Sequence, residues 1–337
     1  AKKGVTFENT FTPCVWTRDS HAALFTGRFL SSFIPPMLPE SIPTISEALN
    51  SIGYKTVAFS NNSWVNNAPG GVLRGFKNVF MVHQLLKNEK KENINRLFEE
   101  VGEPGERDKG SLYTVHLAEK WLDENCDDKT NFFMFINVLE THWSYWPPQP
   151  FREKYLLHGV TDEMAREIPQ FRWPIRLECI PRNPWEWSVM FSLLDGETAT
   201  LDHRLGLLLH YFEEKGILDD TVIIVTSDHG DVFWEHPGYE GHCTTYDANI
   251  HIPLIIKGPS EYFPKGKRVT HITQLHDIFP TLMDLIGIKD KNIMKNIQSQ
   301  SLFTAINDEP RRNFAVCERS LGPVPGAPLT VPKYKAY

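Results

Sequence analysis

The chain has 337 residues, of which 41% are hydrophobic and 23% charged, and its net charge is −7. A chain of this length buries a large core, and its acidic charge with interspersed signs argues against a dedicated nucleic-acid binder. It contains no run of about 18 apolar residues, so no transmembrane segment is predicted.

The cysteines are few and far apart. They show neither CxxC nor Cys/His zinc spacing, and they are Cys14, Cys126, Cys179, Cys243 and Cys317. A sparse set with an odd count is typical of reduced thiols, which favours a cytoplasmic protein. Both ends of the chain resemble interrupted elements, AKKGVTF at the start and VPKYKAY at the finish, so we expect a chain truncated at both ends.

Helical and strand patterns alternate along the chain. In the first half of the chain, the residue pattern predicts a strand or turn in GVTFENTF, a helix over 44–52, a strand in YKTVAFS, a helix over 111–126 capped by Ser111, and a strand in NFFMFINVLE. The second half predicts a helix over 188–215, strands in TVIIVTSDHG and HIPLIIKGP, a helix in THITQLHDIFPTLMDLIGI, and a strand in NFAVCE. The runs FFMFINV and TVIIVT are continuously apolar, as in strands buried on both faces.

This order of elements predicts the fold class. Helix–strand alternation with short connections indicates a single α/β domain over 1–337, with a mainly parallel sheet sandwiched between helices. Residues 143–187 are rich in Trp, Pro and Arg and lack periodicity. We interpret them as an irregular insertion over the edge of the sheet or the mouth of a site.

Polar side chains follow both apolar strands. Asp228 and His229 come directly after TVIIVTS, and His142 comes shortly after FFMFINV. Ligands of parallel α/β sheets bind at the carboxyl ends of the strands. Taken singly, Asp228 is equally suited to capping a turn and His142 to bonding a carbonyl. Together they favour a site, in which a carboxylate and an imidazole hold a divalent cation.

The stretch CVWTRDSHAALFTG holds four possible nucleophiles, which are Cys14, Thr17, Ser20 and Thr26. Ser20 precedes the apolar run AALF, where a serine usually caps a helix. The sequence pattern alone does not choose among the others.

Six fragments in order resemble the sulfatase-like family of the alkaline phosphatase superfamily. They are GVTFENTFT, SHAALFTGRF, TISEALNSIGYKTVAFSNN, ETATLDHRLGLLLHYFEEKGILDDTVIIVTSDHGD, HIPLIIKGP and HDIFPTLMDLIGI. The resemblance implies an alkaline phosphatase/sulfatase-like fold and a metal-dependent hydrolase of sulfuric or phosphoric esters. It also implies a divalent ion (Mn, Zn, Ca or Mg) in one site, with a second site left open.

The resemblance bears on the choice of nucleophile. In formylglycine sulfatases the nucleophile stands nine residues before the Thr of the LxTG motif, and nine residues before Thr26 stands Thr17. A second register aligns Cys14 with the family's cysteine, but it needs a three-residue insertion and replaces the motif's Pro by Trp16. We favour Thr17, and with it a phosphoryl ester or diester, because threonine adducts must be released by attack of water.

Roles for the other residues follow from the same resemblance. Asp228, His229 and Thr17 are the expected metal ligands. Arg18 and His21 are candidates for positive charge near the ester, although Arg18 can equally pair with Asp19. Two histidines match family positions near the substrate, His142 in THWSYWPP and His242 in GHCTTYD. The expected substrate is a small-molecule, saccharide or lipid ester.

The sequence departs from the family upstream of these motifs. The family's first strand ends in Asp residues that complete the metal shell, and no such strand is present here. We therefore expect that the first strand and a C-terminal subdomain are missing from this chain. Two alternatives remain, which are an inactive sulfatase-like anion-binding protein and a phosphotransferase that uses an alcohol acceptor.

Overall fold

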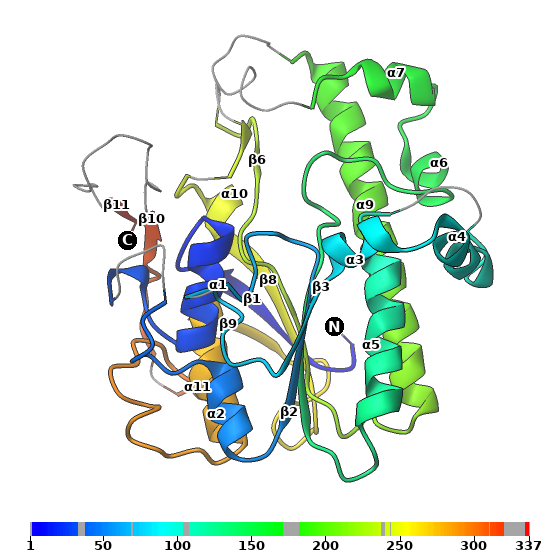
Figure 1. Cartoon of the computed structure of the whole chain (residues 1–337). Helices are drawn as coiled ribbons and strands as arrows, with labels where there is room; N and C mark the ends of the chain where they lie inside the picture. The colour runs from blue at the N-terminus through cyan, green and yellow to red at the C-terminus, as the bar shows by residue number, and fades with distance from the viewer. Residues whose placement is uncertain are drawn as a thin grey trace.

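Helices flank two β-sheets in the computed structural model of the chain (Figure 1). The structure describes residues 2–32, 38–68, 70–103, 108–170, 182–236, 240–242, 244–309, 311–319 and 334–336. This arrangement confirms the expected α/β fold.

The two larger sheets differ in strand direction. One has the order β5-β8-β1-β9, with strands β5 (Ile223–Thr226), β8 (His251–Lys257), β1 (Val5–Phe11) and β9 (Arg268–Gln274). The other has the order β3-β2-β4, with strands β3 (Asn78–Met81), β2 (Lys55–Ser60) and β4 (Phe132–Asn137). The β3-β2-β4 sheet is wholly parallel, and β1 and β9 are parallel, but β8 runs antiparallel to β1 and to β5.

The first sheet is therefore mixed, where a mainly parallel sheet was predicted. The segment between β5 and β8 explains the reversal. Its described residues form only the hairpin β6 (Val232–Phe233) and β7 (Glu240–Gly241) and the short helix α10 (Asp247–Ile250). A parallel return needs a crossover connection, usually a longer helix packed on the sheet, and this segment does not provide one. A last pair, β10 (Cys317–Arg319) and β11 (Tyr334–Ala336), is also antiparallel.

The helices divide between the two faces of the sheets (Figure 1). Trp121 of α5 and Phe212 of α9 pack on the face that carries Phe59. Phe25 of α1 and Phe279 of α11 pack on the opposite face. Their bounds are α1 (Thr17–Thr26), η1 (Leu30–Ser32), α2 (Ile45–Ser51), α3 (Val82–Asn88), α4 (Lys91–Glu100), α5 (Ser111–Asn125), α6 (Phe151–Tyr155), α7 (Asp162–Glu167), α9 (Pro184–Glu214), η2 (Leu275–Asp277), α11 (Ile278–Leu285) and α12 (Leu302–Ile306). None of the described helices is both long and apolar enough to span a membrane.

Strands β4 and β5 are less buried than their apolar sequences predicted. Every residue of both strands is partly exposed. Each strand pairs on one side only, β4 with β2 and β5 with β8, and no ladder joins them among the described strands. Met134 and Ile223 nevertheless pack into one hydrophobic cluster, and Phe135 and Ile224 pack into another. Alternate side chains of a strand point to opposite faces, so the unpaired edges of β4 and β5 belong to the same layer.

Two local predictions need correction. The predicted helix in THITQLHDIFPTLMDLIGI begins only at Ile278, because its first residues form β9 beside β1. Thr270, Ile272 and Thr273 are β-branched, which favours a strand when a partner is available. Ser111 is the first helical residue of α5, and Gly110 is its cap. The side chain that accepts hydrogen bonds at the start of α5 is Asp108, whose carboxylate accepts from the backbone N–H groups of Gly110 and Leu112.

The predicted insertion over 143–187 is described except for residues 171–181. It contains two short helices, α6 and α7, which pack against the first half of α9. Tyr145, Ala165 and Ile168 form this contact with Val189 and Met190. The insertion therefore has a small core of its own on α9.

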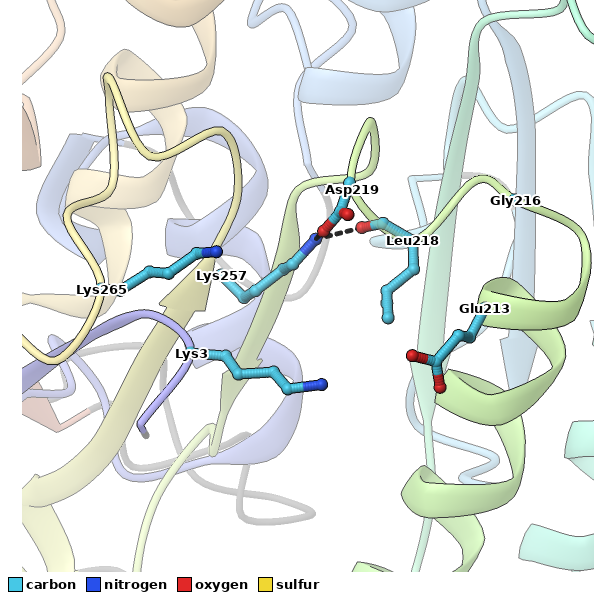
Figure 2. Close-up of a pocket in the computed structure, with 7 residues that line it drawn as sticks. All are labelled: Lys3, Glu213, Gly216, Leu218, Asp219, Lys257 and Lys265. Carbon is cyan, nitrogen blue, oxygen red and sulfur yellow. Dashed lines mark hydrogen bonds and ion pairs between the residues drawn. The ribbon is translucent and has the colours of Figure 1, made fainter.

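A pocket of about 280 Å³ opens beside the amino end of β5 (Figure 2). Lys3, Lys257 and Lys265 line one side, and Glu213 of α9 lies on the other. Lys257 donates to the Asp219 carboxylate at 3.2 Å. This pocket lies at the opposite end of β5 from the polar residues that the sequence singled out.

Candidate active site

The candidate site lies where the carboxyl end of β5 meets the amino end of α1. Thr17 is the first residue of α1, and His229 follows two residues after Ser227 at the end of β5. The Thr17 Oγ1 atom is 3.2 Å from His229 Nε2. The two segments are 212 positions apart in the chain, so the fold brings a hydroxyl and an imidazole together as the sequence predicted.

Helix α1 begins four residues earlier than a cap at Ser20 predicts, since its cap is Trp16. Trp16 makes no side-chain capping bond. Ser20 is therefore inside the helix and does not cap it. Its hydroxyl donates to the Asp228 carbonyl at 2.8 Å and lies 3.0 Å from Thr12 Oγ1. Ser20 thus ties α1 to the end of β5.

Asp228 and His229 form the predicted carboxylate–imidazole pair. Asp228 Oδ1 accepts a hydrogen bond from the His229 backbone N–H at 3.0 Å, and Oδ2 is 3.6 Å from His229 Nε2. Burial acts to raise the pKa of the Asp228 carboxyl, but the neighbouring His229 and His21 outweigh it and hold that pKa below its ordinary value. Asp228 is therefore an ionised carboxylate at neutral pH, as a metal ligand must be.

His21 is buried beneath this pair. Its Nδ1 atom is 2.6 Å from the Thr17 carbonyl and 3.7 Å from Asp228 Oδ2, and its Nε2 is 3.5 Å from Asn137 Nδ2. Burial lowers the pKa of the His21 imidazole, against the pull of Asp228. Burial therefore opposes the positive charge expected of His21, and its role near the ester stays a prediction.

Cys14 lies in a different environment. Its side chain is 1% exposed and packs with Ala22 and Leu30 in the hydrophobic core. Burial, with added repulsion from Asp19, raises the pKa of its thiol well above the ordinary value. A buried, protonated thiol is a poor nucleophile. Thr17, in contrast, is partly exposed and contacts His229.

His242 and His142 extend the site towards the insertion. The ring of His242 lies 4.6 Å from that of His229 and 6.0 Å from that of His142, measured between centroids. Lys109 Nζ donates to the His142 carbonyl at 2.5 Å and pairs with the buried Glu197 carboxylate at 2.8 Å. Helix α9 thus holds the His142 segment in place through Glu197.

Arg18 is the predicted site residue with the weakest link to this cluster. Its guanidinium Nε lies 3.9 Å from Asp19 Oδ1. The alternative pairing with Asp19 is therefore present, between a partly exposed Arg18 and a buried Asp19. A direct role for Arg18 on substrate stays a prediction.

Comparison with known proteins decides the family. A family model described as Sulfatase matches residues 1–288. The chain belongs to the sulfatase family. A sulfatase of Formosa agariphila is 24% identical over 328 residues, which cover 86% of this chain and 63% of that protein. Arylsulfatase K of Mus musculus is 31% identical over 195 residues, which cover 58% of this chain and 30% of that protein.

Solved structures show the same fold. The phosphonate monoester hydrolase of Agrobacterium radiobacter superposes with a TM-score of 0.75 at 20% identity, covering 96% of this chain and 75% of that one. A protein solved in complex with its substrate D-glucosamine-2-N,6-O-disulfate superposes with a TM-score of 0.72 at 18% identity, covering 96% of this chain and 78% of that one. The chain therefore spans less than two thirds of the length of either sulfatase relative, 63% and 30%, and about three quarters of the two solved structures.

The donor set of this sulfatase-family site fits a divalent metal ion. Asp228 offers carboxylate oxygens and His229 a ring nitrogen, within 3.6 Å of each other. His229, Asp231 and His242 also bring one ligand atom each to within 4.8 Å of one another. Mixed oxygen and nitrogen donors suit Mn or Zn better than Mg or Ca.

Two residues of this site had no predicted role. Asp231 closes the SDHGD fragment, and its Oδ1 lies 3.1 Å from His242 Nδ1. Asn137 ends β4 and lies next to His21. The available signal for Asn137 was a single polar residue at the end of an apolar strand. For Asp231 it was a carboxylate two residues after a proposed ligand.

Proposed function

We propose that this sulfatase-family chain hydrolyses sulfuric or phosphoric esters by attack of Thr17, and that phosphoryl esters or diesters are its better substrates. The observation that carries the proposal is the position of Thr17. Its hydroxyl stands at the amino end of α1, 3.2 Å from His229 Nε2. Backbone N–H groups at a helix amino end stabilise negative charge on ester oxygens.

The nucleophile decides the class of ester. Thr17 Oγ1 releases its proton to water and bonds to the phosphorus or sulfur, while the bond to the leaving oxygen breaks and that oxygen takes up a proton to leave as the alcohol. Water must then attack the adduct, because a threonine ester has no second hydroxyl through which it could collapse to an aldehyde. That requirement favours phosphoryl over sulfuryl esters. The resemblance to a phosphonate monoester hydrolase in fold is consistent with this preference.

A divalent metal ion held by Asp228 and His229 would act as a Lewis acid and lower the pKa of the Thr17 hydroxyl. We propose that His242, whose ring lies 4.6 Å from that of His229, donates a proton to the leaving alcohol. His142 and Arg18 are proposed to contact the ester or its leaving group. The insertion behind His142 would then shape the site for a small-molecule, saccharide or lipid ester.

We also propose that one more strand lies between β4 and β5, as the family resemblance implies. Its support is the pair of unpaired edges in one layer, with side chains of β4 and β5 sharing a cluster on each face. A strand parallel to β4 would end beside Asn137 and Asp228. Carboxylates at its end would add the oxygen ligands that a hard cation requires.

A substrate panel tests the nucleophile. Aryl sulfate, phosphate monoester, phosphodiester and phosphonate monoester are offered to the wild type, Thr17→Ala and Cys14→Ala in the presence of Mn²⁺ or Zn²⁺. We expect Thr17→Ala to lose on the order of 10³-fold or more in kcat, as nucleophile removal does. Cys14→Ala should stay within a few-fold of the wild type, because its thiol lies in the core.

The reverse pattern, with Cys14→Ala inactive and Thr17→Ala active, would show that the register is wrong. A wild type that hydrolyses none of the four esters, with metal supplied, would favour the inactive anion-binding alternative. Acceleration by added alcohols, with transfer of the phosphoryl group to them, would favour the phosphotransferase.

A further inference from the structure

Trp16 is an exposed aromatic side chain directly before the proposed nucleophile Thr17. Its side chain is 40% exposed, whereas the two residues before it, Cys14 and Val15, are buried. The Trp16 backbone is extended at the amino end of α1, and its carbonyl accepts a hydrogen bond from the Ser20 backbone N–H at 2.9 Å. The indole ring therefore lies at the protein surface, next to the hydroxyl that the proposed reaction uses.

The segment that carries Trp16 is anchored to the core. Cys14 packs with Ala22 of α1 in one hydrophobic cluster, and Val15 packs with Ile250 in another. Helix α1 holds the backbone on the other side of Trp16. Because the backbone is fixed on both sides, a ligand that contacts the indole orders little of the chain, and the entropy cost of that contact is small.

The indole ring of Trp16 lies beside the imidazoles of the candidate site. Its centroid is 5.8 Å from that of His242, and the two ring planes are at 82°. The His242 ring is in turn 4.6 Å from that of His229, whose Nε2 atom is 3.2 Å from Thr17 Oγ1. An edge-to-face contact occupies a face of only one of the two rings. The exposed part of the indole therefore offers apolar surface to a ligand that reaches Thr17.

The other groups proposed to contact the ester are polar or charged. His242, His142 and Arg18 suit an anion and the oxygen of a leaving group, and none of them has a large apolar face. An indole has such a face, and it attracts flat rings in offset-stacked or edge-to-face arrangements. Single exposed aromatic residues are common on protein surfaces. The contact with His242 and the position next to Thr17 distinguish Trp16 from them.

We propose that Trp16 is a specificity-determining residue, and that its indole packs against an aromatic ring in the leaving alcohol of the ester. The inference rests on the proposed function, because it takes the leaving group to lie beside Thr17 and His242. Trp16 takes no part in the bond changes. Its contribution is therefore made equally in the bound substrate and in the transition state, and it acts on KM more than on kcat.

Three phosphate esters of primary alcohols test this assignment, which are the benzyl, cyclohexylmethyl and methyl esters. The first two leaving groups are similar in size and differ in aromaticity. Steady-state kinetics compare the wild type, Trp16→Ala, Trp16→Phe and Tyr262→Ala in the presence of Mn²⁺ or Zn²⁺. Tyr262 is the matched control, because it is 42% exposed and follows β8 at the end that pairs with the amino end of β5, away from the site.

We expect Trp16→Ala to raise KM for the benzyl ester by about 3- to 10-fold, with a much smaller change for the methyl ester. Trp16→Phe should recover most of the preference for the benzyl ester, and Tyr262→Ala should behave like the wild type. An unchanged ratio of kcat/KM between the benzyl and cyclohexylmethyl esters in Trp16→Ala would overturn the proposal. An equal fall in kcat for all three esters would overturn it too, because Trp16 would then only position His242.

Binding without turnover separates this inference from the proposed function. Benzylphosphonate and cyclohexylmethylphosphonate, whose carbon–phosphorus bonds replace the ester bond, are titrated into the wild type and Trp16→Ala by calorimetry. Loss of a preference for benzylphosphonate in Trp16→Ala supports the contact even where the substrate panel shows that Thr17 is not the nucleophile. If Thr17 proves to be the nucleophile and the wild type binds both phosphonates equally, the proposed function stands and the assignment of Trp16 fails.

Discussion

Gly230 shows how a single residue can set the site. The chain must turn sharply between the end of β5 and the β6–β7 hairpin, and there it approaches α10 closely. A Cβ atom added at Gly230 would lie 2.1 Å from the Ala248 carbonyl oxygen. Only glycine fits, and its position fixes His229 on one side and Asp231 on the other. The geometry of the Asp-His-Gly-Asp run therefore depends on the glycine at its third position.

Replacing this glycine should damage the fold and the site together. We expect Gly230→Ala to lower the free energy of unfolding by about 1–3 kcal/mol, because the backbone of α10 must move. Urea unfolding measures the loss. Gly206→Ala is the matched control, since a Cβ at this α9 position meets nothing within 4 Å and should stabilise the helix by about 0.5–1 kcal/mol. Equal effects of the two variants would contradict the close-approach argument.

Strands β4 and β5 pair with neighbours differently from what their sequences predicted. The pattern of apolar residues located β4 and β5 correctly but predicted full burial, and the described residues leave one edge of each strand without a ladder partner. Burial on both faces depends on neighbours that a local pattern does not contain. The split of THITQLHDIFPTLMDLIGI into β9 and α11 has the same origin, because the parallel partner β1 lies far away in the sequence.

The proposed strand between β4 and β5 makes a prediction for hydrogen exchange. In the complete protein, we expect the amides of β4 and β5 to be protected along both edges, because a third strand pairs with each. Strands β3 and β9 are internal controls, since each pairs on one side only among the described strands. Exchange at the facing edges of β4 and β5 as fast as at the outer edges of β3 and β9 would contradict the proposal.

At the scale of the whole molecule, a buried polar cluster joins the last described segments to the core. Asp277 is fully buried and accepts hydrogen bonds from the Arg311 guanidinium at 2.9 Å, and from Arg312. His276 is fully buried beside it, with its ring 4.6 Å from that of Phe29. Burial lowers the pKa of His276 to about 4.

This histidine should make folding sensitive to mild acid. Between the ordinary pKa of about 6.5 and the folded value of about 4, the unfolded chain binds a proton that the folded chain does not, so stability falls as pH falls. We expect a loss of up to about 3 kcal/mol across that range from His276. Urea unfolding at pH 7 and pH 4.5 measures it. His276→Phe should reduce the pH dependence, whereas the exposed His210→Phe should leave it unchanged.

The sequence by itself determined the fold class, the family, and most of the strand-end residues. The periodicity of apolar residues predicts which segments form helices and strands, and the SDHGD and LFTG motifs are short contiguous segments. Both can therefore be recognised without a structure. They located Thr17, Asp228, His229, His142 and His242 before any contact was known.

Only the tertiary structure decided how these residues meet. It buried Cys14, placed Ser20 inside α1, buried His21 next to Asp228 and brought Asp231 opposite His242. It also reversed β8 and left β4 and β5 with open edges. The physical reason is common to all of these. Burial, pKa and strand pairing depend on neighbours tens to hundreds of residues away, and a local pattern carries no record of them.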